Sequence, residues 1–524
     1  MSVLSAGGSR RDTTQIGSVI SCPCVSDDGR PRSRMLQSLD SLSPREYACE
    51  VWSKEVLGDP RRVKRCGRVF DWMLTRLREE PVGRQRSERR GLQRFLDNKR
   101  VVTRSLWKKL KEHSLKHLLS LTEVFCAHDS CEIDEHGRNC PSDAGSLRSS
   151  KASGYLTHWS VCIHPEGFVI GALDADAWTR AGNAPVEDHH KRPMSEKESR
   201  KWDRGVNRTE RLLKKAGFRG EVFHAEDKEA DIFEHLCNQA DLKRNVVVRV
   251  DPTDKRYVKV EGGKLPLLDV VATWPVEDTR EKTVVFQKRD LRLGLQAKPR
   301  KVQLELRFGE VLVLAPRWYR GEHKCGRELW VVDVREVDAP AGVKPLHWVL
   351  WCTSPVRTLA RARKVVQVYE ARWGAEEYFF ACKTGCELEE LTVDDITDFR
   401  RLQVVVAAAA NLLVGAVVAA RTTPTAPASN HIDEATQDAI KDAAAFHRIK
   451  IKPGRWTLGK FLLVLAQMGG YELRPDRPYG WRVLWKGWAR VQEHRRIVED
   501  YLERHGDGRK RTGGPGATRA TGPN

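Results

Sequence analysis

The spacing of apolar and polar residues separates helical parts of the chain from β-rich parts. From residue 39 to 118, apolar residues recur at helical intervals, as in "SPREYACEVWSKEVL" and "RVFDWMLTRLREE". From about residue 119, short apolar runs replace this pattern, and "YLTHWSVCIHPEGFVIGALDADAW" predicts two strands that turn at Pro165–Gly167. The change of period therefore predicts a helical region followed by a sheet.

Strands and helices alternate in the next part of the chain. "SLTEVFCAHD" predicts a strand that ends at Asp129, and "GEVFHAED" predicts a strand that ends at Asp227. A helix over 195–217 lies between them and stops at Gly217. The helix "KEADIFEHLCNQA" and the strand "RNVVVRV" follow. A hairpin and then alternating elements predict an α/β fold, with a mixed sheet flanked by helices.

Residues 255–350 are mostly β in character. "KVQLELRF" (301–308) alternates polar and apolar residues, which is typical of a half-buried antiparallel strand. One long helix is then predicted over 357–385. The apolar stretch "VVVAAAANLLVGAVVAA" (404–420) is shorter than the ~20 residues of a membrane span and carries Asn411, so it predicts a buried helix and no membrane partner.

The two ends of the chain lack these patterns. The N-terminal residues are rich in Ser, Gly and Arg, and the C-terminal residues are basic and rich in Gly. The pattern thus predicts seven segments: a disordered extension (1–38), a helical domain (39–118), a first core segment (119–254), a β-rich insertion (255–350), a second core segment (351–390), a helical C-terminal domain (391–505) and a disordered tail (506–524).

Charge narrows the choice of partner. The 524-residue chain has a formal net charge of +20, which favours a polyanionic partner, most often nucleic acid. Residues 41–118 contain 21 Lys and Arg against 10 Asp and Glu. A solvated helical face is the ordinary explanation of such a run. Because Trp72, Phe95 and Trp107 are interleaved with the arginines, we expect contact with the DNA backbone instead.

Cysteine usage favours an intracellular compartment. The 13 cysteines are scattered without a disulfide framework, and the N-terminus lacks the apolar segment of a secretory signal, so a cytosolic protein is expected. Two groups were considered for zinc: Cys22 with Cys24, and the Cys/His cluster of 126–140. Neither has the spacing of a zinc site. The sequence leaves open whether the second cluster binds a metal.

Three acidic residues are candidates for metal-dependent chemistry. Asp129 and Asp227 end predicted strands, where α/β sheets gather their ligands. Glu376 projects from the predicted helix over 357–385. Three carboxylates from separate elements could hold two divalent cations about 4 Å apart. Those metals would activate a water or a 3′-hydroxyl and stabilise the leaving oxygen of a phosphodiester. Spacing alone also fits a turn residue at Asp129 and a solvent-facing glutamate at Glu376.

The predicted helix carries a polar stripe. At about 100° per residue, Tyr369, Arg372, Glu376 and Lys383 fall within roughly 60° of one another. Trp373, Phe379 and Phe380 border this stripe, which favours a polar cleft over a solvated face. In such a cleft an acid would bind metal, while Arg and Lys would bind phosphate oxygens.

These residues resemble a known family. Tyr369-x2-Arg372-x3-Glu376-x6-Lys383 matches the YREK signature of the DDE cut-and-paste transposases of the insertion-sequence-four family, found in bacterial composite transposons. The resemblance extends over most of residues 45–500, including "WSKEVLGDPRR", "HDS", "EDKEADIFEHL", "LHWVLWCTSPVRTLARARKVVQVYEARW", "LAQMGGY" and "LWKGWARVQ".

The resemblance implies a fold and a reaction. The fold would be a ribonuclease-H-like (retroviral-integrase-like) catalytic core with a β-rich insertion, between a helical DNA-binding domain and a helical dimerisation domain. Two Mg²⁺ ions, for which Mn²⁺ may substitute in the family, would be held by Asp129, Asp227 and Glu376. The enzyme would cleave double-stranded DNA at transposon ends through a hairpin intermediate and join the 3′ ends to target DNA. It would act as a homodimer near the bacterial nucleoid.

The resemblance also implies residues that grip the DNA. They are Tyr369, Arg372 and Lys383 of the signature, Trp348 in a flipped-base pocket, Arg249 near the DNA, and Arg61 and Arg62 in the N-terminal domain. For Trp348, a core tryptophan in a strand is the alternative. One family position departs, because Phe380 stands where the family has a basic residue. Two other functions stay open: a catalytically silent, transposase-derived inhibitor, and a metal-dependent nuclease that does not join strands.

Overall fold

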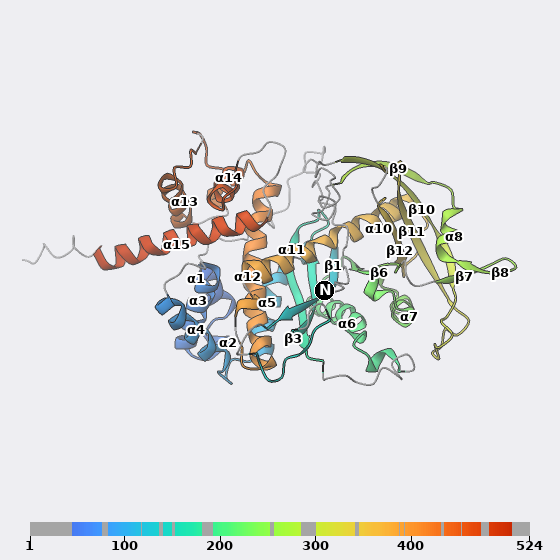
Figure 1. Ribbon diagram of the computed structural model, residues 1–524, viewed down its shortest axis with the longest axis horizontal. Helices are drawn as coiled ribbons and strands as arrows, with labels where there is room; N and C mark the ends of the chain where they lie inside the picture. The colour runs from blue at the N-terminus through green and yellow to red at the C-terminus, as the bar shows by residue number, and fades with distance from the viewer. Residues whose placement is uncertain are drawn as a thin grey trace, which may run out of the picture. The chain divides into compact units, whose positions relative to one another are not determined.

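The chain folds into two compact units. The described residues of the larger unit fall within Val51–Arg62 and Gln93–Val418, and those of the smaller unit within Ser33–Glu50, Val63–Leu92 and Ala419–Asn524. The computed structural model (Figure 1) describes residues 44–75, 82–116, 118–135, 140–148, 152–180, 192–251, 256–284, 300–340, 345–386, 388–391, 393–430, 434–451, 453–472 and 481–505. The predicted disordered segments at the two ends of the chain lie outside these ranges.

The larger unit is a mixed α/β structure, as the alternation of strands and helices predicts. Its first strands are β1 (Glu123–Asp134), β2 (Gly145–Ser146), β3 (Ser153–Ile163), β4 (Val169–Trp178), β5 (Glu221–Glu226) and β6 (Asn245–Arg249). β1 pairs in parallel with β5, and β5 with β6, whereas β3 pairs antiparallel with both β1 and β4. The spatial order is thus β4-β3-β1-β5-β6.

The β-rich part continues the same sheet. It contains β7 (Tyr257–Val260), β8 (Gly263–Pro266), α8 (Leu267–Ala272), β9 (Asp278–Val284), β10 (Arg300–Val313), β11 (Arg327–Val337) and β12 (His347–Cys352). β12 returns antiparallel to β6, with Leu350 opposite Arg249, so the insertion joins the core through backbone pairing. The predicted alternation in β10 is confirmed from Lys301 to Leu306, where Val302, Leu304 and Leu306 are buried, and it ends at Arg307, which is buried as well.

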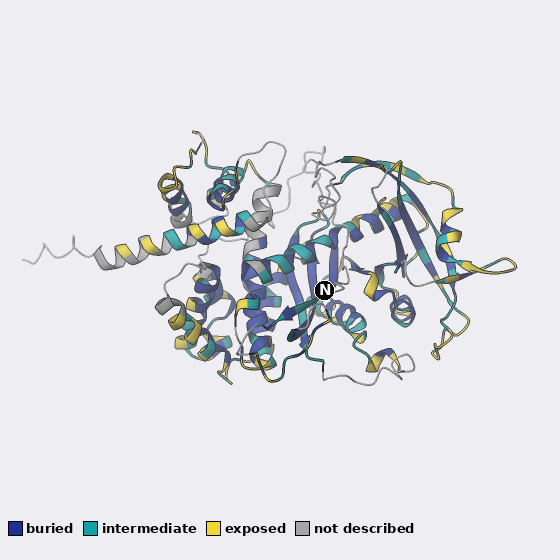
Figure 2. Ribbon diagram, viewed as in Figure 1, coloured by how far each residue is buried: buried dark blue, intermediate teal, exposed yellow. Residues whose placement is uncertain are grey.

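Helices cover both faces of the core strands (Figures 1 and 2). α6 (Arg200–Lys215) packs on β1, β3 and β4, and α7 (Phe233–Asp241) packs on β6. α10 (Leu359–Ala371) and α11 (Trp373–Phe380) also contact β1. Because successive strand residues point to opposite faces, α6 on one face and α10 and α11 on the other contact alternate side chains of β1. His128 lies against Gly205 of α6, whereas Asp129 lies against Arg372, between α10 and α11.

The helix predicted over 357–385 is interrupted. α10 ends at Ala371, α11 begins at Trp373, and a π-helical turn follows at Ala381–Gly385. A π turn adds a residue to the repeat and shifts the phase of the side chains. The prediction of one uninterrupted helix over 357–385 is therefore wrong, although Arg372 still contacts both Tyr369 and Glu376.

A second correction concerns Asp129, which was expected at the end of a strand. β1 continues to Asp134, so Asp129 lies in its middle, with its Cα opposite that of Trp159 in β3. The apolar run does end near Asp129. The strand nevertheless continues to Asp134, because residues 130–134, most of which are only partly buried, pair with β3. Hydrophobicity alone could not show this, since hydrogen bonding to a neighbour holds those residues in the sheet.

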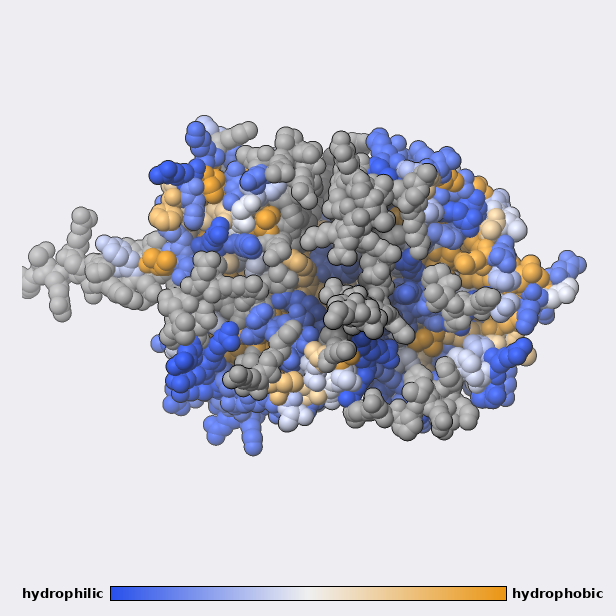
Figure 3. All heavy atoms as spheres, in the orientation of Figure 1, coloured by the Kyte–Doolittle hydropathy of each residue, from blue (hydrophilic) through white to orange (hydrophobic). Residues whose placement is uncertain are grey.

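The apolar stretch of residues 404–420 begins as a buried helix, as predicted. It belongs to α12 (Ile396–Thr422), whose residues up to Val418 lie in the larger unit together with α5 (Thr103–Lys116). Asn411 is 7% exposed, and its Oδ1 accepts hydrogen bonds from Ala172 N (3.2 Å) and Tyr378 Oη (2.8 Å). Among the described residues, no helix has the length and apolar character to span a membrane. Hydrophilic side chains are prominent on the face drawn in Figure 3.

The remaining α-helices are α1 (Pro44–Val51), α2 (Lys54–Leu57), α3 (Pro60–Thr75), α4 (Val82–Leu96), α13 (Glu434–Phe446), α14 (Leu458–Met468) and α15 (Trp481–His505).

In the smaller unit, α14 and α15 pack through glycines. A Cβ on Gly487 would lie 1.7 Å from Leu465 O, and one on Gly469 would lie 1.7 Å from Val483 O. Only glycine permits so close an approach of the two backbones.

Candidate active site

The register of two parallel strands places Asp129 beside Asp227. His128 of β1 pairs with Glu226, the last residue of β5. The next residue after each of these two is an aspartate. Asp129 and Asp227 therefore lie at the same level of the two neighbouring strands. Asp227 lies directly after β5, as predicted, and its Oδ1 accepts a hydrogen bond from Glu229 N at 2.9 Å.

Arg372 connects Asp129 to Glu376. Its Nη1 donates to Asp129 Oδ2 at 2.9 Å, and its Nη2 donates to Glu376 Oε1 at 2.9 Å. The Arg372 side chain is 5% exposed, whereas those of Asp129 and Glu376 are 15% and 29% exposed. A buried guanidinium thus holds two carboxylates that lie far apart in the sequence, and charge-assisted bonds of this kind are strong.

The three acids influence one another electrostatically. Burial raises the pKa of Asp129 to about 6, with Arg372 opposing the shift and Glu376 adding to it. Burial and the negative charge of Asp129 raise the pKa of Asp227 to about 7. Burial also raises the pKa of Glu376, and Asp227 contributes to that shift. The site therefore concentrates more negative charge than Arg372 neutralises.

The donor chemistry suits a hard divalent cation. Carboxylate oxygens are the ligands that Mg²⁺ prefers, and a cation would stabilise the charged carboxylates against the burial and the mutual repulsion that raise their pKa values. The spacing is looser than that of a closed metal site. In the part of the chain that the structure describes, three acidic ligand atoms lie within 4.8 Å of one another only at Asp97, Asp394 and Asp398. At the Asp129 site, Arg372 takes up coordination that a metal would need.

The sequence did not predict the cluster of Asp97, Asp394 and Asp398. Asp97 and Asp394 are exposed and Asp398 is buried. Burial and a hydrogen bond with Asp97 raise the pKa of Asp398 to about 6, and Arg401 donates to Asp398 at 2.7 Å. The three residues are too far apart in sequence for spacing to reveal them. Their carboxylate oxygens lie close enough together to hold a metal ion.

The predicted DNA-binding residues Tyr369 and Trp348 pack against each other. Their rings meet edge to face with centroids 5.5 Å apart, and Lys282 Nζ lies 5.3 Å from the Trp348 ring. Trp348 is 3% exposed and Tyr369 is 6% exposed. The Arg372 guanidinium lies 5.8 Å from the Tyr369 ring, so Tyr369 and Trp348 lie beside the acid cluster. A stacking role for Trp348 stays a prediction that requires this pair to open.

Lys383 is turned to a different set of partners. Its Nζ donates to Glu132 O at 2.5 Å and to Glu389 Oε1 at 2.9 Å. Lys383 belongs to the π turn and lies near the C-terminal end of β1, where it does not share the partners of Arg372. A role in phosphate binding stays a prediction. Phe380, which stands at a basic position of the resembling family, ends α11.

The other predicted DNA contacts lie on different elements. Arg249 ends β6 and is partly buried. Arg61 and Arg62 lie in the first turn of α3; Arg61 is exposed and pairs with Asp59 at 3.0 Å, and Arg62 donates to Leu57 O. Neither contact joins them to the acid cluster, and their role in DNA binding stays a prediction.

A buried histidine network lies on the opposite face of the same strands. His128 Nε2 lies 2.8 Å from His224 Nδ1, and His224 Nε2 lies 3.0 Å from Glu210 Oε1. His235 bridges Glu226 and Asp203 at 2.6 Å each. His128 precedes Asp129 and Glu226 precedes Asp227, so the network fixes the strand segments that carry both acids. The sequence carried a signal of this network: His128, His224 and Glu226 are polar residues inside otherwise apolar strands, at positions that alternate with the two aspartates.

The Cys/His cluster of residues 126–140 does not gather around one point in its described part. Cys126 is buried on the α6 side of β1, packed with Cys162 and Leu213, whereas Cys140 is exposed. His136 lies outside the described residues, as do Cys22 and Cys24. No protein-family model matches this chain.

Proposed function

We propose that this chain is a DDE-type DNA transposase with a ribonuclease-H-like core, similar to the insertion-sequence-four family. The observation that carries the proposal is the gathering of Asp129, Asp227 and Glu376 around Arg372. A central strand, the end of its parallel neighbour and a helix supply one acid each. The strand order β4-β3-β1-β5-β6, with β1, β5 and β6 parallel, supports the assignment of the core.

The proposed cofactor is Mg²⁺, with Mn²⁺ as a substitute, held by Asp129, Asp227 and Glu376. When bound, a pair of such ions supplies activation of a hydroxyl nucleophile and stabilisation of the leaving oxygen in phosphodiester cleavage. Arg372 belongs to the same machinery, because its guanidinium, which bridges Asp129 and Glu376, has the planar donor geometry that binds phosphate oxygens.

The proposed substrate is double-stranded DNA that carries the transposon ends. A chain with a net charge of +20 attracts the DNA backbone, and the exposed Arg61 adds to that attraction at the start of α3. The enzyme would cleave the ends through a hairpin, join the 3′ ends to target DNA, and act as a homodimer at the nucleoid.

The deciding experiment incubates the purified protein with Mg²⁺ and DNA that carries the flanks of its own gene. We expect hairpin and strand-transfer products on gels, and we expect Glu376→Gln to abolish them. Glu377→Gln is the matched control, since it removes the same charge from the next residue of α11. Binding without cleavage in any divalent metal would leave the silent, inhibitor-like protein. Random nicking that depends on Glu376 would indicate a nuclease that does not join strands.

A further inference from the structure

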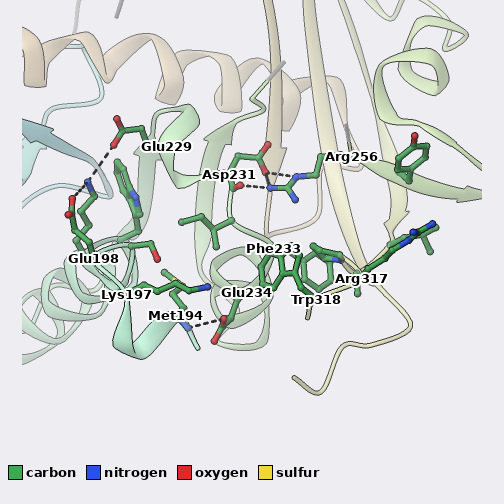
Figure 4. Close-up of a pocket in the computed structure, with 18 of the residues that line it drawn as sticks. Met194, Lys197, Glu198, Glu229, Asp231, Phe233, Glu234, Arg256, Arg317 and Trp318 are labelled. Atoms are coloured by element: carbon green, nitrogen blue, oxygen red, sulfur yellow. Dashed lines mark hydrogen bonds and ion pairs between the residues drawn. The ribbon is translucent and has the colours of Figure 1, made fainter. Parts of the chain in front are cut away.

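The larger unit contains a cavity of about 770 Å³ (Figure 4). Its walls come from the segment before α6, the segment after Asp227, the β7–β8 hairpin and the connection from β10 to β11. Glu229 belongs both to the cavity and to the acid cluster. It lines the cavity, its backbone N–H binds Asp227, and its charge contributes to the raised pKa values of Asp129 and Asp227. The cavity therefore adjoins the two aspartates.

The cavity offers an aromatic face. Trp318, in the connection from β10 to β11, is 40% exposed, although large apolar side chains are normally covered. Lys197 Nζ lies 5.2 Å from the centre of its ring. Tyr257, on the opposite hairpin, is also exposed, and Lys264 Nζ lies 4.9 Å from its ring. Two aromatic rings, each accompanied by a lysine, thus line one space.

The charges around the cavity leave an excess of cations. The acids that line it are engaged: Asp231 binds Arg256, Glu234 accepts a hydrogen bond from Met194 N, Glu198 binds Arg180 and Glu229 binds Lys201. Figure 4 shows the first two of these contacts. Lys197, Lys264 and Arg317 make no ion pair with any residue in the described ranges. The open positive charge therefore sits beside the exposed rings.

We propose that this cavity binds an unpaired nucleotide, its base stacked on Trp318 and its phosphate held by Lys197 and its basic neighbours. Grooves that bind single strands combine these two features, since every base has a face that stacks and every phosphate a charge. A volume near 770 Å³ lies within the range of small-ligand pockets and is too small for a duplex. This inference rests on the proposed function, in which the strand would leave the aspartates and enter the cavity.

The nucleotide could belong to a DNA strand or be free in solution, and one experiment separates these sources. The full-length protein is titrated into a fluorescent oligothymidylate, and anisotropy reports binding. Free thymidine monophosphate is the competing probe. We expect Trp318→Ala to weaken binding roughly tenfold and Trp318→Phe to weaken it much less. We expect Lys197→Gln to reduce the dependence of binding on salt by about one ion, while Lys214→Gln, an exposed control in α6, leaves it unchanged.

Position is tested with an oligonucleotide that contains 5-iodouracil, which crosslinks to a stacked aromatic ring on irradiation. A crosslink that maps to Trp318 by mass spectrometry supports the proposal. Displacement of the oligonucleotide by the free nucleotide at similar concentrations would assign the cavity to mononucleotides, and an advantage of the oligonucleotide of at least tenfold would assign it to a strand. Wild-type binding by both Trp318→Ala and Lys197→Gln, with their folds verified by circular dichroism, would overturn the proposal.

The two proposals fail separately. If Trp318→Ala binds single strands as the wild type does while Glu376-dependent strand joining persists, the nucleotide site is wrong and the transposase stands. If no DNA is cleaved but binding still depends on Trp318, the transposase proposal is wrong, and the cavity is a nucleotide site in a protein with a different function.

Discussion

Arg372 binds Asp129 across a distance of 243 residues in the sequence, with 2.9 Å between Nη1 and Oδ2. The same guanidinium binds Glu376, one turn further along the chain. Arg372 is the cation of a site with three acids, each of which has a raised pKa. It stabilises the cluster when no metal is bound, and it competes with a metal for the same oxygens.

Removal of this charge is expected to destabilise the larger unit. Arg372→Met keeps most of the side-chain volume but leaves Asp129 and Glu376 without their partner. Without divalent metal, we expect a loss of about 3–5 kcal/mol in the free energy of unfolding, measured by urea denaturation at neutral pH. Arg372→Lys keeps the charge but not the two-armed geometry, and its loss should be smaller. Equal stabilities of Arg372→Met and the wild type would contradict this role.

Magnesium is expected to stabilise the protein through Asp227. At about 100 times its dissociation constant, a ligand that binds only the folded state adds about 2.7 kcal/mol, which thermal unfolding would detect as a higher Tm. Asp227→Asn should abolish the rise. Asp394→Asn is the matched control, because it disrupts the tighter acidic group of Asp97, Asp394 and Asp398. If only Asp394→Asn abolishes the rise, the metal binds that group instead.

His235 should make stability fall at alkaline pH. Burial alone would lower its pKa, but Glu226 and Asp203 raise it to about 10. The unfolded value is near 6.5, so this stabilisation is complete below pH 6.5 and is lost as pH rises through 10. We expect the free energy of unfolding to fall by a few kcal/mol more between pH 7 and pH 10 in the wild type than in His235→Gln. Parallel curves for the two proteins would show that the bridge does not titrate.

Asn411 is expected to stabilise the packing of α12 on β4. Its Oδ1 accepts hydrogen bonds from Ala172 N and Tyr378 Oη, and Gly171 lies against it. Asn411→Ala would leave the buried Ala172 N–H without its acceptor, at about 1–3 kcal/mol for a group left unsatisfied, whereas the Tyr378 hydroxyl keeps its hydrogen bond to Ala407 O. Tyr378→Phe removes one donor alone and should cost less. Chemical denaturation of both variants tests this order, and a cost for Asn411→Ala below that for Tyr378→Phe would contradict it.

Much of the local structure could be predicted from residue patterns. The hairpin at Pro165–Gly167, the strand before Asp227, the alternation in β10 and the buried helix with Asn411 are all confirmed. Each follows from the burial of nearby residues, which fixes the period of apolar positions over a few turns or steps. The same patterns predicted a mixed sheet flanked by helices.

The arrangement of the site depended on contacts that no local pattern contains. The register of β1 with β5 set Asp129 beside Asp227, and pairing with β3 carried β1 past Asp129. The helix that carries Arg372 and Glu376 ends in a π turn, in which Lys383 contacts Glu132 and Glu389. The cavity around Trp318 likewise needs four segments to meet.

The sequence by itself therefore determined which segments form strands and helices, though not where each one ends, and which residue types could serve a phosphodiester chemistry. The tertiary structure decided which of those residues meet. The physical reason is that hydrophobic periodicity records only whether a position is covered, whereas register, helix breaks and cavities depend on which distant segment covers it.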